Sequence, residues 1–263
     1  MTADYRDTDE FRDARFTHVD LSGATFRDCD LRRVKVVDSW LTDLNVSGEL
    51  GSIRVNDVDV TGYVEGELDR RHPERVQVRD MSTTDDYRAA WDTIERLWAQ
   101  TISRAERLPE PMLYERVDDE WSLVQTLRHL VFATDAWVLR AVLDEPVPYH
   151  PLGLTHTGYP PQAAAALGID LTADPPYAEV LLVRADRLRR VHDVVDALSS
   201  AELDRPTTQP PAPGYPEQVR TVGYCLRVLM SEECEHRRYA ERDLSVLEAR
   251  GFGDDGGLAS SAD

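Results

Sequence analysis

Cysteine is scarce in this sequence, which has 263 residues and only three thiols, at Cys29, Cys225 and Cys234. Their spacing gives neither a CxxC pair nor a disulfide framework, so reduced thiols are the simplest interpretation. No apolar run approaches the length of about 20 residues that a membrane-spanning helix needs. The opening stretch, MTADYRDTDEF, has alternating charges and lacks the apolar segment of a secretory signal. These absences predict a cytoplasmic protein that makes no use of a membrane.

Basic residues are outnumbered, since 30 Lys and Arg face 49 Asp and Glu for a formal net charge of −19. An acidic surface repels phosphate backbones and anionic lipids, so neither nucleic acid nor membrane is expected as a partner. The hydrophobic share of 41% is that of a globular protein with a core. The length suits one large domain or two ordinary ones, at about 100–200 residues each.

The first part of the chain has a period of five, which belongs neither to a helix nor to a flat strand. Small side chains stand two positions before most of its regularly spaced apolar residues. A repeat of this length is typical of a solenoid, in which each unit buries its face against its neighbours. The spacing is five residues throughout except for one interval of four, between Val46 and Leu50. The apolar positions are Phe11, Phe16, Leu21, Phe26, Leu31, Val36, Leu41, Val46, Leu50, Val55 and Val60.

This segment resembles the pentapeptide-repeat family, whose unit is approximately A(D/N)LXX. Asp20-Leu21-Ser22-Gly23 and Cys29-Asp30-Leu31 fit that unit well. The resemblance covers residues 9–62 and implies a short right-handed quadrilateral β-helix with the central Leu or Phe inward. Cys29 would then be a small inward-facing residue. Residues 63–82 follow as a connector, in which His72-Pro73 marks a linker or a terminal strand.

From Ser82 the period becomes helical, with Thr83 and its neighbours as cap candidates. Four helices with one long connection suggest a four-helix bundle over residues 83–250. The predicted fold is therefore α+β in two parts, a short β-helix followed by an antiparallel bundle. The helices are expected at 82–107, 121–143, 177–198 and 217–250, with a Pro- and Gly-rich loop at 144–175 and a disordered tail at 251–263.

The apolar stripe of the fourth helix is interrupted by SEECEH, residues 231–236. In helical projection Glu233 and His236 lie on the stripe, and Glu232 lies at its edge beside His236. A polar group that faces a bundle core is costly unless it has a partner. Carboxylate and imidazole one turn apart can hold a metal ion. A surface Glu-His pair, or a core His bonded to another helix, is the alternative interpretation.

The second helix carries His129, which periodicity alone places at the boundary of the apolar stripe. Its sequence WSLVQTLRHLVFATDAW resembles the second helix of the DinB superfamily, where a metal-binding His follows seven residues after the Ser of a Trp-Ser cap. SEECEHRRYAERDL is similar to that family's last helix, where two ligands are four residues apart, and the mycothiol-dependent branch has Glu first. The likeness covers residues 83–250. It implies the metal ligands His129, Glu232 and His236, with Glu233 as the alternative to Glu232.

Three protein ligands leave coordination positions open for water or substrate. Two imidazoles and a carboxylate suit one divalent ion, either Zn(II), Ni(II), Fe(II) or Mn(II). In catalytic relatives a low-molecular-weight thiol such as mycothiol, bacillithiol or glutathione binds the metal. The resemblance thus implies a metal-dependent thiol S-transferase that acts on an electrophile in detoxification or biosynthesis, and by analogy a homodimer. A non-catalytic metal-binding interaction module is the alternative.

Further candidates flank this proposed site. His150, His156 and Tyr159 stand in the loop that could cover the bundle mouth, although a structural Pro-rich loop explains them equally well. Tyr239 and Asp243 continue the edge of Glu232 and His236 and could hold an imidazole tautomer. A core Tyr and a surface Asp are the simpler interpretation of that pair.

Overall fold

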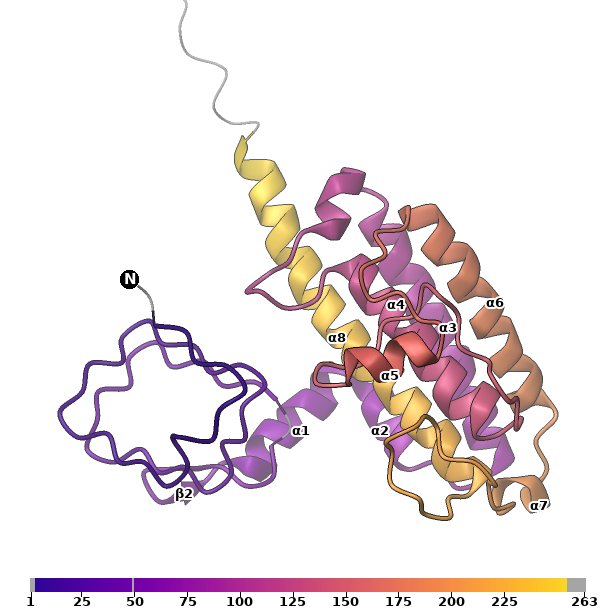
Figure 1. Cartoon of the computed structure of the whole chain (residues 1–263), viewed down its shortest axis with the longest axis horizontal. Coiled ribbons are helices and arrows are strands. Elements are labelled where there is room, and N and C mark those ends of the chain that lie inside the picture. The colour runs from indigo at the N-terminus through magenta and orange to yellow at the C-terminus, as the bar shows by residue number, and fades with distance from the viewer. Residues whose placement is uncertain (1–2, 49, 255–263) are drawn as a thin grey trace, which may run out of the picture. The chain divides into compact units, whose positions relative to one another are not determined.

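The computed structural model describes the backbone of residues 3–48 and 50–254 and the side chains of that range as far as Arg250. The chain divides into two compact units, residues 1–46 and 47–263. Figure 1 shows the first as a coil of turns and the second as a group of helices. The disordered tail predicted from residue 251 lies outside the described residues from 255 onward. Before that point, the last helix continues to Asp254.

The backbone of the first unit repeats every five residues, as the sequence predicts. Left-handed conformations occur at every fifth position from Asp13 to Asp43, including His18 and Gly23. Tight turns also recur every ten residues, where the amides of Ala14, Ala24 and Val34 donate to the carbonyls three residues before them. Asp and Gly tolerate the left-handed region better than most residues do. Each five-residue unit therefore supplies one corner of the coil.

The β-helix expected from these repeats is present only in part. Residues 3–46 contain no assigned strand, and the apolar positions are about half exposed, with Leu21 at 47% and Phe26 at 60%. Cys29, predicted to face inward as a small residue, is exposed. In a solenoid each unit buries its face against its neighbours, and so short a coil is mostly made of terminal units. The apolar positions consequently keep much of their surface.

The repeats predicted to resume at Leu50, Val55 and Val60 form a hairpin instead. Strand β1 (Arg54–Val55) pairs antiparallel with β2 (Val58–Asp59), and Val55 lies opposite Val58. Between them Asn56 and Asp57 have φ of 48° and 64°. Two consecutive residues with positive φ form the two-residue turn that joins hairpin strands, and Asn and Asp are common there.

Two helices replace the connector or terminal strand predicted at 63–82. They are α1 (Thr61–Arg71) and α2 (Pro73–Arg79). Pro73 is the first residue of α2, where its fixed φ suits a helix and its missing N–H is not needed. Helix α2 packs against the third and eighth helices, and its Val78 is buried. The segment is therefore part of the helical unit.

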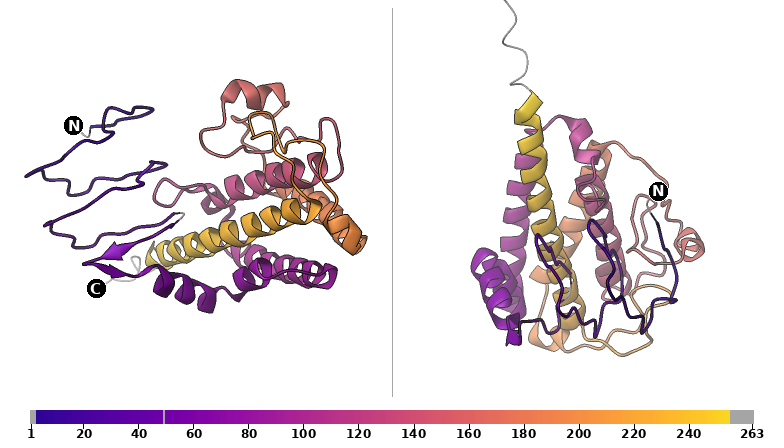
Figure 2. Two further views of the ribbon diagram at one scale, coloured as in Figure 1. Left: turned by 90° about the horizontal axis from the view of Figure 1, so that it is seen from below. Right: turned by 90° about the vertical axis from the view of Figure 1, so that its left-hand side faces the viewer.

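Four longer helices form the bundle, which Figure 2 shows from two sides. Within it, α3 packs on α6 and α8, and α4 packs on the same two helices. Fully buried residues of the core include Trp91, Phe132 and Leu226. The four helices are α3 (Thr84–Ala105), α4 (Leu123–Thr134, continued by the π-helical turn η2, Asp135–Arg140), α6 (Tyr177–Asp196) and α8 (Val222–Asp254), joined by η1 (Glu110–Tyr114), α5 (Pro161–Ala166) and α7 (Ser200–Leu203).

The starts of two bundle helices are fixed by capping boxes. Thr83 caps α3 together with Asp86, and Ser122 caps α4 together with Gln125. Each side-chain cap stabilises its helix by about 1 kcal/mol. The cap at Ser122 defines where α4 begins and so which face of it carries His129. No helix in the described ranges combines the length and the apolar character that crossing a membrane requires.

Candidate metal centre

Side chains from α4 and α8 meet inside the bundle. His129 Nε2 lies 3.6 Å from Glu232 Oε2, and His236 Nε2 lies 3.2 Å from the same oxygen. One ligand atom from each of these three residues falls within 4.8 Å of the others. The three ligands implied by the family resemblance are therefore brought together around one point.

A backbone carbonyl orients the His129 imidazole. Nδ1 lies 3.0 Å from the oxygen of Leu154, and because a carbonyl only accepts, Nδ1 carries the proton. Nε2 then presents its lone pair toward Glu232. His129 is 5% exposed, and burial lowers its pKa, which favours the neutral ring. Neutral imidazole with a free Nε2 is the form that binds metal ions.

Glu232 is ionised in this arrangement. Burial works to raise its pKa, but the imidazole side chains beside it, of which His236 can donate from Nε2 at 3.2 Å, outweigh burial and leave the pKa well below its usual range. A carboxylate oxygen thus faces the lone pair of His129 Nε2. Two acceptors at that distance repel each other unless a proton or a metal ion lies between them. With the His129 proton held on Nδ1, a divalent ion is a positive charge that fits this donor set.

The indole of Trp121 packs against both imidazoles. Its ring centroid lies 4.7 Å from that of His129 and 5.9 Å from that of His236, while the two imidazoles are 4.7 Å apart. Trp121 stands directly before the helix cap Ser122. It was not among the predicted site residues, because it lies before α4 and helical periodicity does not extend to it.

The 144–175 loop is fastened to α4 through its backbone. The amide of Leu154 donates to the carbonyl of Arg128, and the Arg128 guanidinium donates to the carbonyls of Leu152 and Asp170 at 2.9 and 2.8 Å, and to that of Ala173. The loop contributes the Leu154 carbonyl to the centre rather than a side chain. Sequence reasoning missed Leu154 because a backbone carbonyl that accepts a hydrogen bond has no residue signature.

The loop side chains predicted to line the site have other partners. His150 Nδ1 accepts from the amide of Leu152, and His156 Nδ1 donates to the carbonyl of Thr157. Among the described residues, neither histidine belongs to the cluster. Tyr159 is nearer, since its ring lies 6.1 Å from Phe132, which is 6.3 Å from His129. The Tyr159 hydroxyl donates to the carbonyl of Pro213 at 2.9 Å.

Tyr239 and Asp243 are engaged by neighbouring arginines. The ring of Tyr239 lies under the guanidinium groups of Arg238 and Arg242, and Asp243 accepts a hydrogen bond of 2.7 Å from Arg242. At His129 the imidazole is oriented by the Leu154 carbonyl, and an orienting role for Tyr239 and Asp243 beside His236 stays a prediction. A helical projection shows which residues lie along the same edge of a helix, but it does not show which of them are in contact with a neighbouring arginine.

Glu233, the alternative ligand, is fully buried and forms an ion pair with Arg184 of α6. Burial raises the pKa of its carboxyl, and the Arg184 charge opposes that shift. The guanidinium of Arg184 also lies 5.9 Å from the Trp98 ring. The polar residue on the apolar stripe thus serves a contact between helices, which favours Glu232 as the ligand.

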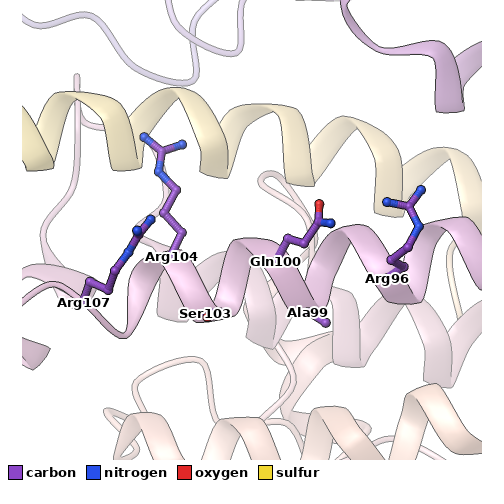
Figure 3. Close-up of a pocket in the computed structure, with 6 residues that line it drawn as sticks. All are labelled: Arg96, Ala99, Gln100, Ser103, Arg104 and Arg107. Atoms are coloured by element: carbon purple, nitrogen blue, oxygen red, sulfur yellow. The ribbon is translucent and has the colours of Figure 1, made fainter.

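Two surface features lie apart from this cluster. Asp92, Glu95 and His192 form a second group of closely spaced ligand atoms, but they are partly or fully exposed, and His192 pairs with Glu95 at 3.1 Å. An open groove of about 480 Å³ runs along α3, and Figure 3 shows the side chains that line it. Its lining residues are Arg96, Ala99, Gln100, Ser103, Arg104 and Arg107, none of which belongs to the cluster.

The bundle and its cluster define a helical protein with a candidate metal site between two of its helices. Residues 93–240, more than half of the chain, match the family model of the DinB superfamily. Residues 10–48 match that of the pentapeptide repeats, in eight copies. The chain therefore belongs to the DinB superfamily and carries an N-terminal pentapeptide-repeat segment. No curated protein and no solved structure matches it significantly.

Proposed function

We propose that this protein is a metal-dependent thiol S-transferase of DinB type, which uses a low-molecular-weight thiol such as mycothiol on an electrophile. One observation carries the proposal: His129, Glu232 and His236 offer three ligand atoms within 4.8 Å of one another. Three protein ligands leave open positions, as catalytic rather than structural metal sites do. Glu at position 232 is also the form that the mycothiol-dependent branch of the family has.

The ligands fit one divalent ion such as Zn(II), Ni(II), Fe(II) or Mn(II). When bound, such an ion lowers the pKa of a coordinated thiol and so provides a thiolate nucleophile at neutral pH. The contribution of the chain is to hold the ligands in the right state. Leu154 keeps the proton of His129 on Nδ1, and Glu232 remains a carboxylate.

The surrounding aromatic residues would control access to the ligands. Trp121 packs on both imidazoles and excludes water from that side. Tyr215 approaches from the segment before α8, with its ring 5.9 Å from that of His156. Burial, and to a lesser degree the charge of Glu232, raise the pKa of Tyr215 to about 12, so its hydroxyl stays protonated. A protonated phenol is a hydrogen-bond donor for the electrophile.

A non-catalytic metal-binding interaction module is the second candidate. The first unit supports it, because Trp40 is 100% and Val37 74% exposed, and exposed apolar surface marks interaction sites. For this unit we further propose a short right-handed quadrilateral β-helix. Its support is the left-handed residue that recurs every five positions, which would give one coil four corners.

Metal analysis followed by thiol titration tests both candidates. Native protein is expected to contain about one divalent ion per chain, and the visible spectrum of the Co(II)-substituted form should change when mycothiol, bacillithiol or glutathione is added. Bound metal without any spectral response to these thiols would reject the transferase and leave the interaction module. Protein that binds no divalent ion would reject both.

A further inference from the structure

A buried arginine without a counter-charge lies where α8 begins. Arg220 is 5% exposed, and its Nη1 and Nη2 donate only to the backbone carbonyls of Gln218 and Pro216, both at 3.1 Å. Within the described ranges no carboxylate forms an ion pair with it, and its Nε–H has no hydrogen-bond acceptor. Buried arginines are rare unless they are paired, because removal of their charge from water is costly.

Among the described residues, the buried arginines Arg128 and Arg184 and the half-buried Arg187 have either a carboxylate partner or a full set of filled donors, although Arg184 Nη1 has no hydrogen-bond acceptor. Arg184 forms an ion pair with Glu233, and Arg187 binds Asp135 with an N–O distance of 2.7 Å. Arg128 lacks a carboxylate partner, but its Nε, Nη1 and Nη2 each donate to a carbonyl. Arg220 differs from Arg128 because its Nε–H has no acceptor among the described residues. It differs from Arg184 and Arg187 because no carboxylate in that part of the chain pairs with it.

A second buried polar side chain belongs to the residue paired with Arg220 through the backbone. Thr207 donates its amide to the Arg220 carbonyl at 2.7 Å, next to an antiparallel bridge between Pro206 and Thr221. It is 8% exposed, and apart from the weakly accepting Cys225 thiol its hydroxyl has no partner among the described residues. Burial raises the pKa of Cys225 to about 11, and both Arg220 and Thr207 oppose that shift. Both side chains thus approach the same neutral thiol in the first turn of α8.

The helix end adds to the positive potential at this point. Helix α8 is 33 residues long, and the positive end of its dipole lies at Val222, two residues after Arg220. The guanidinium lies 5.7 Å from the centroid of the Trp137 ring. Charge, unfilled donors and helix dipole all favour an anion here. A single uncompensated guanidinium matches one negative charge, which is that of a carboxylate rather than of a phosphate dianion.

We propose that Arg220 and Thr207 form an anion site at the head of α8, which takes the carboxylate group of a small molecule. The site is covered by a surface segment, since Pro216 and Gln218 are exposed. That segment starts at Gly214, whose φ of +88° other residues rarely adopt. A carboxylate would accept from Arg220 Nε and from the Thr207 hydroxyl.

Titration of the full chain with ¹³C-labelled acetate at constant ionic strength tests this site, and NMR of the labelled acetate measures binding. Wild-type protein should bind acetate saturably, and Arg220→Gln should weaken binding by about tenfold or more. Arg96→Gln is the matched control, because Arg96 is an exposed arginine in the groove of Figure 3. This control should leave binding unchanged. If Arg220→Gln does not fold, Thr207→Val keeps the size of the side chain and should still weaken acetate binding.

Two further arms separate this site from the metal centre and from other anions. His129→Ala should leave acetate binding intact, because the two sites share no residue. Loss of acetate binding in His129→Ala would instead assign the acetate to the metal centre. Inorganic phosphate should bind more weakly than acetate. Folded wild-type protein without saturable acetate binding, equal binding by Arg220→Gln, or a preference for phosphate would each overturn the proposal.

Discussion

A hydrogen bond of 3.0 Å joins Nδ1 of His129 to the carbonyl of Leu154, and so connects a bundle helix to the 144–175 loop. This contact decides which nitrogen of the ring carries the proton. It therefore also decides that Nε2 faces Glu232 without a proton of its own.

Removal of a ligand imidazole should empty the centre. We expect His129→Ala and His236→Ala each to lose the single divalent ion, because two remaining ligands bind too weakly to survive dialysis. His192→Ala serves as the control, since its cluster lies at the surface and pairs with Glu95. Elemental analysis of the three purified variants measures the metal content. Retention of metal by both ligand variants would rule out the proposed triad.

Loss of the Trp121 indole should weaken metal binding without abolishing it. Trp121→Ala exposes both imidazoles to water and removes the surface that orients them, and outer groups of this kind typically contribute about 10- to 100-fold in affinity. Trp121→Phe keeps an aromatic face and should bind metal nearly as well as wild type. Competition with a chromophoric chelator measures both affinities. Equal affinity in the Ala and Phe variants would contradict the role of the ring.

Glu233 should matter for folding and not for metal content. Glu233→Gln leaves Arg184 buried without its counter-charge, which should cost about 3–5 kcal/mol in the free energy of unfolding. The double variant Glu233→Met/Arg184→Met removes both charges and should recover much of that loss. Urea denaturation gives the stabilities, and elemental analysis should show unchanged metal in the folded double variant. A loss of metal there would restore Glu233 as a ligand.

Asp135 should make stability depend on pH in the acid range. Burial raises its pKa to about 6, although Arg187 at 2.7 Å and the amide of His150 at 2.8 Å oppose the shift. The folded state then binds more protons than the unfolded state between about pH 4 and 6, so this group lowers stability as pH rises through that window. As the pH rises from about 4 to 6, the free energy of unfolding of the wild type should fall by up to about 3 kcal/mol relative to that of Asp135→Asn.

Urea denaturation of the two proteins at intervals from pH 4 to pH 8 checks this behaviour. Their difference should become constant above the pKa of Asp135, where the carboxyl is ionised in both states. A difference that stays flat from pH 4 to 6, or that grows in favour of wild type, would contradict the raised pKa.

The bundle follows from local signals in the sequence, and the candidate ligands follow from the resemblance to the DinB superfamily. Capping residues such as Ser122 mark where helices begin, and the Trp-Ser and Glu-x-x-x-His motifs place His129, Glu232 and His236 on two helices. Helical spacing also places Glu233 on the core face of its helix, where a polar side chain needs a partner. Spacing within one helix cannot show that this partner is Arg184 of another helix, and for that reason Glu233 resembled a metal ligand.

Contacts made by the backbone and by distant segments escaped prediction. The Leu154 carbonyl is chemically the same in any residue, so no pattern marks it. Pro73 suggested a break in structure, whereas here it opens a helix. The five-residue period continued in the sequence past Gly48, but Asn56 and Asp57 turned the chain into a hairpin. In each case tertiary context selected among conformations that the sequence alone allows.

Arg128 and His129 are consecutive in α4, and both hold the same loop, one through its guanidinium and the other through its ring. The amide of Leu154 is hydrogen-bonded to the Arg128 carbonyl in the same place. Metal binding at the ligand cluster should therefore be detectable in the loop, because the Leu154 amide should exchange hydrogen for deuterium more slowly in metal-bound protein. The loop backbone would act as a built-in reporter of whether the imidazole beside it is engaged.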